Sequence, residues 1–289
     1  MSEPATITRP AHAKVNLALS VAPPEPSGMH PICSWMACVD LADHLTLTRL
    51  GPEAPSAFDL RWEDGSPVAW ATDADLTVRA HAALEGALGR RLPVRVELRK
   101  TIPDGGGLGG GSSDAASLLL ALNDLFALGQ SIEALREVAR PLGSDIAFFL
   151  DEVDRRVPRP AVVSGLGDRI ERAGPLHAEV TLVCPPFGCA TGSVYRAYDR
   201  APGALRAEEV RAMAGAEPEP GRLFNDLADA AERVEPRLGE LRTYLAGALG
   251  LPVHVSGSGS TLFVIGPEGS AERTRLSAPS CRVLPTRFV

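Results

Sequence analysis

The sequence contains few cysteines, and those present are scattered. Only five occur among 289 residues, their number is odd, and they form no C-x-x-C pair. This pattern fits neither a disulfide framework nor a zinc site built from closely spaced cysteines. We therefore expect reduced, mostly structural thiols in a cytoplasmic protein. The five are Cys33, Cys38, Cys184, Cys189 and Cys281.

Long apolar runs and basic blocks are missing as well. No uninterrupted apolar run reaches the roughly 18 residues that a membrane span needs. The opening stretch, MSEPATITRP, has an early acid and no apolar core, so it does not predict a secretory signal. The formal net charge is −7, and lysine and arginine form no dense cluster. We therefore expect neither a membrane nor a nucleic acid as partner, while a local basic pocket for a small anion stays open.

The remaining composition is that of a globular protein, with 45% apolar and 22% charged residues. Alternating apolar residues predict strands at 13–21 and 93–103. Helical spacing of apolar residues predicts helices at 73–89 and 112–128. Strands and helices are interspersed without a regular βαβ repeat. This order and the chain length predict an α+β fold in two domains or lobes.

The most informative stretch is KTIPDGGGLGGGSSDAASLLLALNDL, at residues 100–125. Six of the seven residues from Gly105 to Gly111 are glycine, and Leu108 is the exception. Glycine loses much conformational freedom on folding, so this density predicts a close approach of backbone to another group. The order of elements is strand, glycine loop, helix. Backbone N–H groups of such a loop and the N-terminus of the helix can bind an anion together.

Several kinds of glycine loop are compatible with this order. A P-loop needs a lysine directly after the glycines, and none occurs. The Rossmann pattern G-x-G-x-x-G fits literally, but so dense a window matches almost any glycine pattern. A protein-kinase loop requires V-A-I-K and H-R-D further on, and both are absent from the sequence. A flexible linker would mix glycine with serine or proline, whereas here a patterned strand and an apolar helix flank the loop.

The stretch resembles the signature P-x-G-x-G-L-G-S/G-S-S of the GHMP kinases. Within that superfamily it is most similar to the family of 4-diphosphocytidyl-2-C-methyl-D-erythritol kinases. Further segments resemble this family in the same order along the chain. They are AHAKVNLALSV at 11–21, SGMH at 27–30, PLGSDIAFFL at 141–150, GLGDRI at 165–170, FNDL at 224–227 and VSGSGSTLFVI at 255–265.

The resemblance implies a two-lobed fold in which each lobe is a β-sheet packed with helices and the active site lies in the cleft between them. Residues 1–155 would form the N-terminal ATP-binding domain and residues 156–289 the C-terminal domain. The implied reaction is phosphorylation of the 2-hydroxyl of 4-(cytidine 5′-diphospho)-2-C-methyl-D-erythritol in the non-mevalonate isoprenoid pathway. ATP would be the donor, with Mg²⁺ as its counter-ion and no dedicated metal ligands. The partner is then a small cytidyl substrate, and the protein a monomer or homodimer.

The resemblance also assigns an ATP-binding segment. The glycines would surround the phosphates with backbone N–H groups, and two serines would add hydroxyls near the phosphates or Mg²⁺. The positive end of the following helix would point at the same charge. The segment comprises Pro103, Asp104, Gly105, Gly106, Gly107, Leu108, Gly109, Gly110, Gly111, Ser112 and Ser113.

Two charged residues are candidate catalytic groups. From the residues alone, Asp145 is typical of a helix cap, and Lys14 of a strand-end lysine that extends to solvent. The resemblance instead implies that Asp145 is the catalytic aspartate and that Lys14 pairs with it and faces the substrate hydroxyl. Asn16 shares a strand face with Lys14 and is a further candidate for substrate contact.

The candidate cytidine site departs from the family pattern. Met29 stands where the family has a tyrosine, so the resemblance leaves His30 to bond the base edge and Tyr195 to stack on it. Tyr195 is equally compatible with a core aromatic. Thr191 is a further candidate substrate contact, and Asp75 replaces a family asparagine.

Two other functions stay open from the sequence. One is another GHMP kinase, acting on a mevalonate-, homoserine- or sugar-like alcohol. The other is a catalytically inactive sensor of the same fold, and the presence of both Lys14 and Asp145 counts against it. The connector at 151–160 looks longer than is usual in the family.

Overall fold

The computed structural model describes residues 5–151, 157–267 and 269–289. The chain divides into two compact units. Unit 1 comprises Met1–Ala13, Leu41–Ile102 and Gly109–Pro158, and unit 2 comprises Lys14–Asp40, Pro103–Leu108 and Arg159–Val289. The predicted domain boundary at 155 and the middle of the predicted connector, at 152–156, lie outside the described residues.

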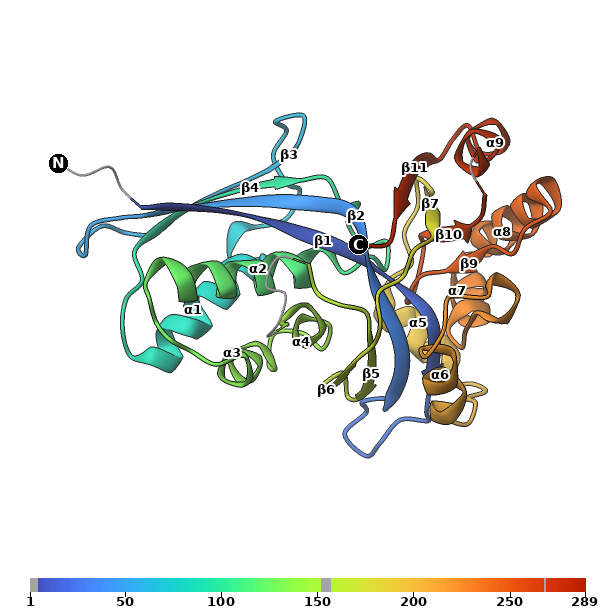
Figure 1. Cartoon of the computed structure of the whole chain (residues 1–289), viewed down its shortest axis with the longest axis horizontal. Coiled ribbons are helices and arrows are strands. Elements are labelled where there is room, and N and C mark those ends of the chain that lie inside the picture. Colours follow the sequence, from blue (N-terminus) through green and yellow to red (C-terminus); the bar gives the residue numbers. More distant parts are fainter. Residues whose placement is uncertain (1–4, 152–156, 268) are drawn as a thin grey trace. The chain divides into compact units, whose positions relative to one another are not determined.

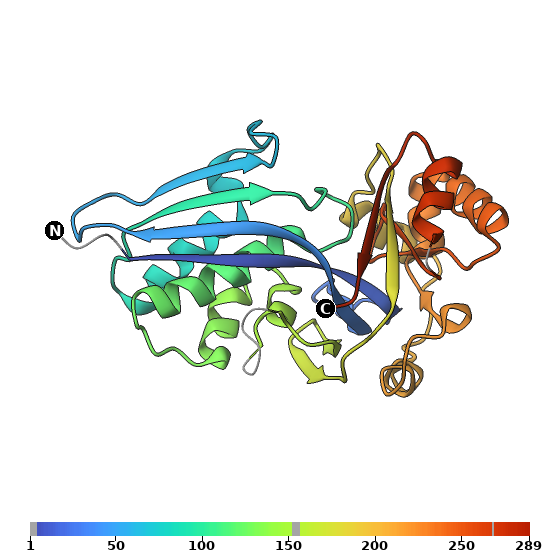
Figure 2. The same ribbon diagram turned by 45° about the horizontal axis from the view of Figure 1, so that its top comes forward.

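Unit 1 is built on a sheet with helices on one face. Its strands run in the order β3-β4-β2-β1, with β2 antiparallel to β4 and β4 parallel to β3, and Figure 2 shows them side by side. The helices α1 to α4 all lie on the same face of these strands (Figure 1). The elements are β1 (Thr6–Val21) and β2 (Ile32–Arg49), which both continue into unit 2, β3 (Ala57–Trp62), a 3-10 helix (Thr72–Ala74), α1 (Leu76–Leu88), β4 (Val94–Lys100), α2 (Gly110–Leu125), α3 (Ile132–Ala139) and α4 (Ile146–Phe149).

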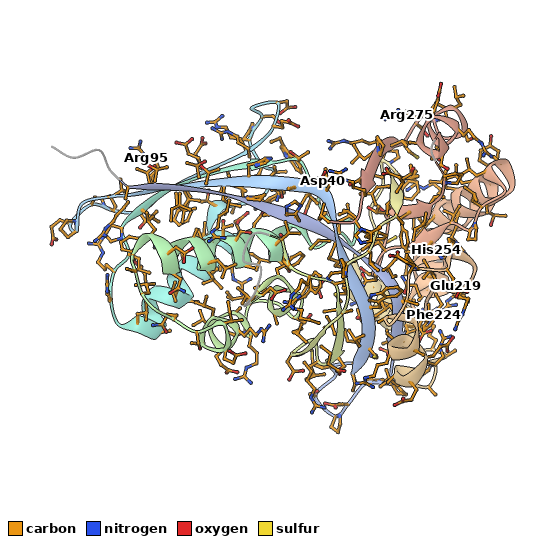
Figure 3. The ribbon with its side chains drawn as sticks, in the orientation of Figure 1. Asp40, Arg95, Glu219, Phe224, His254 and Arg275 are labelled. Carbon is orange, nitrogen blue, oxygen red and sulfur yellow. The ribbon has the colours of Figure 1, made fainter. Side chains whose placement is uncertain are left out.

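Strand β4 shows why the sheet has one covered face. Val94, Val96 and Leu98 are buried, and they alternate with charged side chains. Arg95 lies on the face away from the helices (Figure 3). Successive side chains of a strand point to opposite faces, so this alternation turns the apolar side toward the helices. The strand predicted at 93–103 is confirmed, and it ends at Lys100, shortly before the glycine loop.

Helix α2 is the central helix of unit 1. Nearly all its residues from Ser113 to Leu125 are buried, and most of them are alanine or leucine. The helix predicted at 112–128 is confirmed, although it begins at Gly110 and ends at Leu125. Helix α1 begins after Asp75, whose carboxylate accepts hydrogen bonds from the backbone of Thr77 and the indole of Trp70. Asp75 therefore serves as a helix cap.

Unit 2 contains a four-stranded antiparallel sheet in the order β11-β7-β10-β9. Helix α9 packs against β7 and β11, and Figure 2 shows it beside them. The β5–β6 hairpin pairs with β2, and β8 pairs in parallel with β1. The elements are β5 (Ala161–Gly165), β6 (Arg169–Arg172), β7 (Glu179–Cys184), α5 (Thr191–Tyr198), α6 (Ala207–Met213), a 3-10 helix (Pro220–Arg222), β8 (Phe224–Asn225), α7 (Ala228–Val234), α8 (Pro236–Leu249), β9 (His254–Val255), β10 (Leu262–Ile265), α9 (Ser270–Ser277) and β11 (Arg282–Arg287).

One core joins the sheet and the helices of unit 2. It includes Val183 of β7, Val194 of α5, Leu227 just before α7, Leu238 of α8 and Leu262 of β10, all buried. These residues come from segments far apart in the sequence, so the core forms only when the unit is complete. The α+β class predicted from the sequence is confirmed, since each unit combines a sheet with packed helices.

Candidate active site

The glycine loop connects β4 to α2. Gly105, Gly107 and Gly109 have φ values of +65°, +75° and +71°, a conformation that is costly for residues with a side chain. At Gly107 an added Cβ would lie 2.2 Å from the Ser256 carbonyl oxygen. The loop therefore needs glycine both for its backbone turn and for close packing against a second segment. This confirms the close backbone approach predicted from the glycine density.

That second segment is the turn between β9 and β10. The N–H of Thr261 donates to the Gly106 carbonyl at 3.1 Å, and the Ser256 hydroxyl donates to the Gly107 carbonyl at 3.0 Å. Asn225 holds the turn from the other side, donating to the carbonyls of Val255 and Gly257 at 2.8 and 2.7 Å. The sequence showed the segment VSGSGSTLFVI at 255–265 as similar to the family, but it did not indicate that these residues contact the glycine loop.

Lys14 is buried and belongs to this same group of contacts. It is 3% exposed, its ammonium donates to the Gly107 carbonyl at 2.9 Å and to Asn16 Oδ1 at 2.7 Å, and its backbone N–H donates to the Leu108 carbonyl at 2.9 Å. Asn16 in turn donates to the Ser34 hydroxyl at 2.8 Å. Lys14 is thus not a strand-end lysine that extends to solvent, because its charge is directed at the glycine loop.

Asp145 and the two serines belong to unit 1. Asp145 occupies the N-cap position of α4, but its side chain does not accept the capping hydrogen bond. Helix α4 packs against α2. A Cβ on Gly143 would lie 3.9 Å from the Ser112 hydroxyl, so the segment that precedes α4 lies beside the first turn of α2. Ser112 is partly exposed there, whereas Ser113 is buried.

The predicted cytidine residues gather in unit 2. The rings of His30 and Tyr195 lie 4.9 Å apart between centroids, tilted by 44°. His30 Nδ1 lies 2.9 Å from the Ala22 carbonyl oxygen and Nε2 lies 3.3 Å from an Asp199 oxygen. Both ring nitrogens therefore already face an acceptor within the protein. Met29, next to His30, is 49% exposed.

Thr191 lies at the start of α5. Its hydroxyl is 3.0 Å from the hydroxyl of Ser258 in the β9–β10 turn. Thr191 is therefore joined to the same turn that contacts the glycine loop, through a residue that the sequence did not single out.

Two negative findings concern the described residues only. In the parts of the chain that the structure describes, no group of three or more His, Cys, Asp or Glu side chains is arranged to hold a metal ion. Within those same ranges no helix has the length and apolar character needed to cross a membrane.

Comparison with known proteins identifies the family. The family model described as the GHMP kinases N terminal domain matches residues 75–151. A 4-diphosphocytidyl-2-C-methyl-D-erythritol kinase of Pelotomaculum thermopropionicum is 35% identical over 263 residues, covering 89% of this chain and 88% of that protein. The kinase of the same name from Caulobacter vibrioides is 37% identical over 284 residues, covering 93% and 94%.

Solved structures agree with this similarity. A crystal structure of 4-(cytidine 5′-diphospho)-2C-methyl-D-erythritol kinase matches with a TM-score of 0.77 at 32% identity, covering 98% of this chain and 99% of that one. An L. major mevalonate kinase in complex with R-mevalonate matches with a TM-score of 0.69 at 13% identity, covering 100% and 98%, and shows the fold alone. The resemblance stated from the sequence is confirmed: the chain belongs to the 4-diphosphocytidyl-2-C-methyl-D-erythritol kinase family of the GHMP kinases.

Proposed function

We propose that this protein transfers the γ-phosphoryl group of ATP to the 2-hydroxyl of 4-(cytidine 5′-diphospho)-2-C-methyl-D-erythritol, a step of the non-mevalonate isoprenoid pathway. The observation that carries the proposal is the 2.9 Å hydrogen bond from the Lys14 ammonium to the Gly107 carbonyl. It places a buried cation directly on the glycine loop. The names of relatives at 35% and 37% identity support the choice of substrate.

The phosphates of ATP bind to the glycine loop. Backbone N–H groups between Pro103 and Gly111 surround them, and the N-terminus of α2 adds its positive partial charge. Ser112 is partly exposed in the first turn of α2 and donates its hydroxyl to a phosphate oxygen. The turn between β9 and β10 holds the loop in this shape, because Ser256 and Thr261 donate hydrogen bonds to its carbonyl oxygens.

Phosphoryl transfer depends mainly on positioning and on stabilisation of charge. Lys14 stabilises the negative charge that develops on the transferred group. Asp145 accepts the proton of the attacking hydroxyl as a general base. Asn16, 2.7 Å from the Lys14 ammonium, orients that ammonium and contacts the substrate.

The donor set fits Mg²⁺ as a counter-ion of ATP. Mg²⁺ takes oxygen ligands, keeps several waters and is usually held by one or two protein groups together with phosphates. The Ser112 hydroxyl and the phosphate oxygens of bound ATP would supply such ligands, so a separate cluster of protein ligands would not be needed. When bound, the ion supplies neutralisation of the phosphate charge.

The cytidine group binds beside His30 and Tyr195. Tyr195 offers a ring face for stacking, and its contact with His30 holds the two rings ready as one surface. His30 bonds the base edge through Nε2, which exchanges its contact with the exposed Asp199 side chain for the base. Thr191 contacts the substrate from the start of α5. The position of the active site in a cleft between lobes, the domains 1–155 and 156–289, the monomeric or homodimeric state and the cytoplasmic location stay predictions.

Activity of the purified protein tests the proposal directly. Incubation with ATP, Mg²⁺ and the cytidyl substrate should release ADP and yield the 2-phosphate, identified by phosphorus NMR. Asp145→Asn should lower turnover by about 10²–10⁴-fold, the usual contribution of a positioned general base, and leave nucleotide affinity unchanged. Asp64→Asn is the matched control, because Asp64 holds an exposed turn through Ser66 and should keep full turnover.

Other outcomes would contradict the proposal in distinct ways. Phosphorylation of mevalonate or homoserine in place of the cytidyl substrate would make the protein a different GHMP kinase. ATP binding without any turnover would make it a sensor. Near-normal turnover of the Asp145→Asn variant would leave Asp145 with a structural role at α4.

A further inference from the structure

A cluster of three buried charged side chains lies at the two ends of the glycine loop. Lys100 is the last residue of β4, shortly before the loop, and Asp114 lies in the second turn of α2, shortly after it. Asp43 of β2 is the third member. They are 4%, 1% and 0% exposed, respectively. We call Lys100, Asp43 and Asp114 the Lys100 cluster, and all three belong to unit 1.

The contacts of the cluster hold both ends of the loop together. The Lys100 ammonium donates to Asp43 Oδ2 and Asp114 Oδ2, each at 2.6 Å. It therefore ties the end of β4 to α2. Asp43 Oδ1 also accepts from the backbone N–H groups of Thr101 and Ile102, the latter at 2.8 Å. The carboxylate of Asp43 thus sets the path of the chain as it leaves β4.

The first residue of α2 packs against the same cluster. A Cβ on Gly110 would lie 3.0 Å from the Ile102 side chain and 3.6 Å from Asp43 Oδ2. The start of α2 therefore sits directly on the residues that Asp43 holds. Together these contacts determine how far apart the two ends of the glycine loop lie.

The charges of the cluster act strongly on one another because all three side chains are buried. Burial alone would lower the pKa of Lys100, but attraction to Asp114 and Asp43 outweighs it and raises that pKa, so the ammonium stays charged. Burial raises the pKa of Asp114 well above its ordinary value, and attraction to Lys100 opposes this only in part. The two carboxyl groups face the same ammonium, and the neighbouring Asp43 adds to the effect of burial in disfavouring the ionised form of Asp114.

Such a cluster contributes little net stability. The free energy lost when charged groups leave water is about as large as the free energy gained from their mutual attraction. Proteins in which apolar residues replace a buried ion pair are often as stable as the original proteins. Geometry is the property that the cluster supplies and an apolar core would not. Groups that bind phosphate must be held by a supporting layer of this kind.

We propose that the Lys100 cluster positions the glycine loop for ATP. It holds the end of β4 and the first turns of α2 at the spacing in which the loop N–H groups converge on the phosphates. The three side chains are buried and act through the loop. Lys100, Asp43 and Asp114 are positioning residues for nucleotide binding. The inference rests on the proposed role of the glycine loop in binding ATP.

The decisive variants compare loss of the contact with its conservative replacement. Asp114→Leu removes the acceptor of the Lys100 ammonium and should raise the KM for ATP about ten- to a hundredfold, the effect expected when a site is displaced by about an ångström. The KM for the cytidyl substrate should stay within about twofold, because the substrate does not bind the loop. Asp114→Asn keeps an oxygen that can accept from Lys100 in a side chain of the same shape, so it should restore most of the ATP affinity.

Asn123→Leu is the matched control. Asn123 is also a buried polar residue of α2, but it lies at the far end, where it bonds the backbone of Gln130 at 3.0 and 2.9 Å. Loss of the Asn123 side-chain amide should lower the melting temperature of the protein and leave the KM for ATP unchanged. If Asp114→Leu behaves in the same way, or if both KM values rise together, the cluster has a structural role only and the inference is wrong.

Hydrogen exchange provides a readout that needs no nucleotide. Asp43→Leu removes the acceptor of the Thr101 and Ile102 N–H groups, so the peptide covering 101–111 should exchange faster than in the unmodified protein, while peptides from β7 and β10 should not. Unchanged exchange at 101–111 in a folded variant would overturn the inference. If the unmodified protein fails to bind ATP, the proposed function is wrong, and the exchange result still decides whether the cluster positions the loop.

Discussion

Met29 is the residue at which this chain departs most clearly from the pattern of its family. It lies in the turn between β1 and β2, where its carbonyl accepts a hydrogen bond from Glu25, and its side chain is half-exposed beside His30. A tyrosine at this position would offer a flat face to a base, worth about 1–3 kcal/mol where such stacking has been measured by alanine substitution. A methionine thioether contributes roughly 0.3–1.5 kcal/mol against an aromatic ring. The base should therefore be held more weakly here than in relatives with tyrosine.

Met29→Tyr should lower the KM for the cytidyl substrate by up to about tenfold, because a gain of about 1.4 kcal/mol corresponds to a factor of ten. The KM for ATP should not change. Met29→Leu, which alters the side chain without adding a ring, is the control. It should change neither the KM for the cytidyl substrate nor the KM for ATP. Steady-state kinetics with each substrate varied in turn measures these effects.

Tyr195 gives the complementary check on the same surface. Tyr195→Ala removes the ring that packs on His30 and should raise the substrate KM, whereas Tyr195→Phe keeps the ring and should not. If neither Met29→Tyr nor Tyr195→Ala changes the substrate KM, the cytidine group binds elsewhere or the true substrate has none.

The glycine loop matters at the scale of one element. Its positive φ values alternate along the chain at Gly105, Gly107 and Gly109, and such alternation turns successive N–H groups toward one concave side. Two different constraints act within it. At Gly105 an added Cβ would meet no atom within 4 Å, whereas at Gly107 it would collide with the backbone of Ser256. Backbone conformation and close packing can therefore be separated by mutation.

Gly107→Ala should abolish ATP binding, since the new methyl group would displace either the glycine loop or the turn that holds it. Gly129→Ala is the matched control. Gly129 has a similar φ of +65° and open space around it, so alanine there costs only the backbone strain, about 1–2 kcal/mol. Titration of a non-hydrolysable ATP analogue compares the two variants. Equal affinities would show that Gly107 does not shape a phosphate site.

At the scale of the whole molecule, one partly buried histidine, His254, should contribute to stability against acid. His254 of β9 packs on Phe263 of β10 with 5.3 Å between ring centroids, and Figure 3 shows it in unit 2. Among the described residues its Nε2 has no hydrogen-bond partner. Burial lowers the pKa of His254 to about 4, and a hydrogen bond to the Pro220 backbone opposes this only in part. The folded protein therefore disfavours the protonated ring.

The sign of the pH effect follows from this shift. The unfolded chain binds the proton near the ordinary pKa of about 6.5, so the stability linked to His254 is fully present above that pH. It is lost as the pH falls from about 6.5 to about 4, and no further loss follows below. The total loss is at most about 3 kcal/mol, because one pKa unit corresponds to about 1.4 kcal/mol.

His254→Phe keeps a ring against Phe263 and removes the titrating group. The free energy of unfolding of this variant should fall less steeply between pH 6.5 and 4 than that of the unmodified protein. Denaturant unfolding at several pH values measures the free energy of unfolding of both proteins. Subtracting one curve from the other removes the contribution of the other titrating groups, which the two proteins share. Parallel curves for the two proteins would mean that His254 is hydrated in the folded state.

Local pattern was sufficient to predict much of the fold. Alternation in 93–103 predicted β4, and the apolar run after the glycines predicted α2. Local pattern did not predict a strand that is buried on both faces. Residues 33–39 of β2 are all buried, so the alternation that marks a strand is lost there. The strands predicted from alternation therefore did not include β2, which has 18 residues.

The sequence by itself determined the family and the order of strand, glycine loop and helix, because both depend on residues that are close together in the chain. Only the tertiary structure decided which groups meet at that loop. The Gly107 carbonyl accepts from Lys14, 93 residues away, and from Ser256, 149 residues away, and Asp43 meets Lys100 across 57 residues. A hydrogen bond depends on distance and direction in space, and separation along the chain does not encode either. For that reason Ser256, Asn225 and the Lys100 cluster could be recognised only in the folded protein.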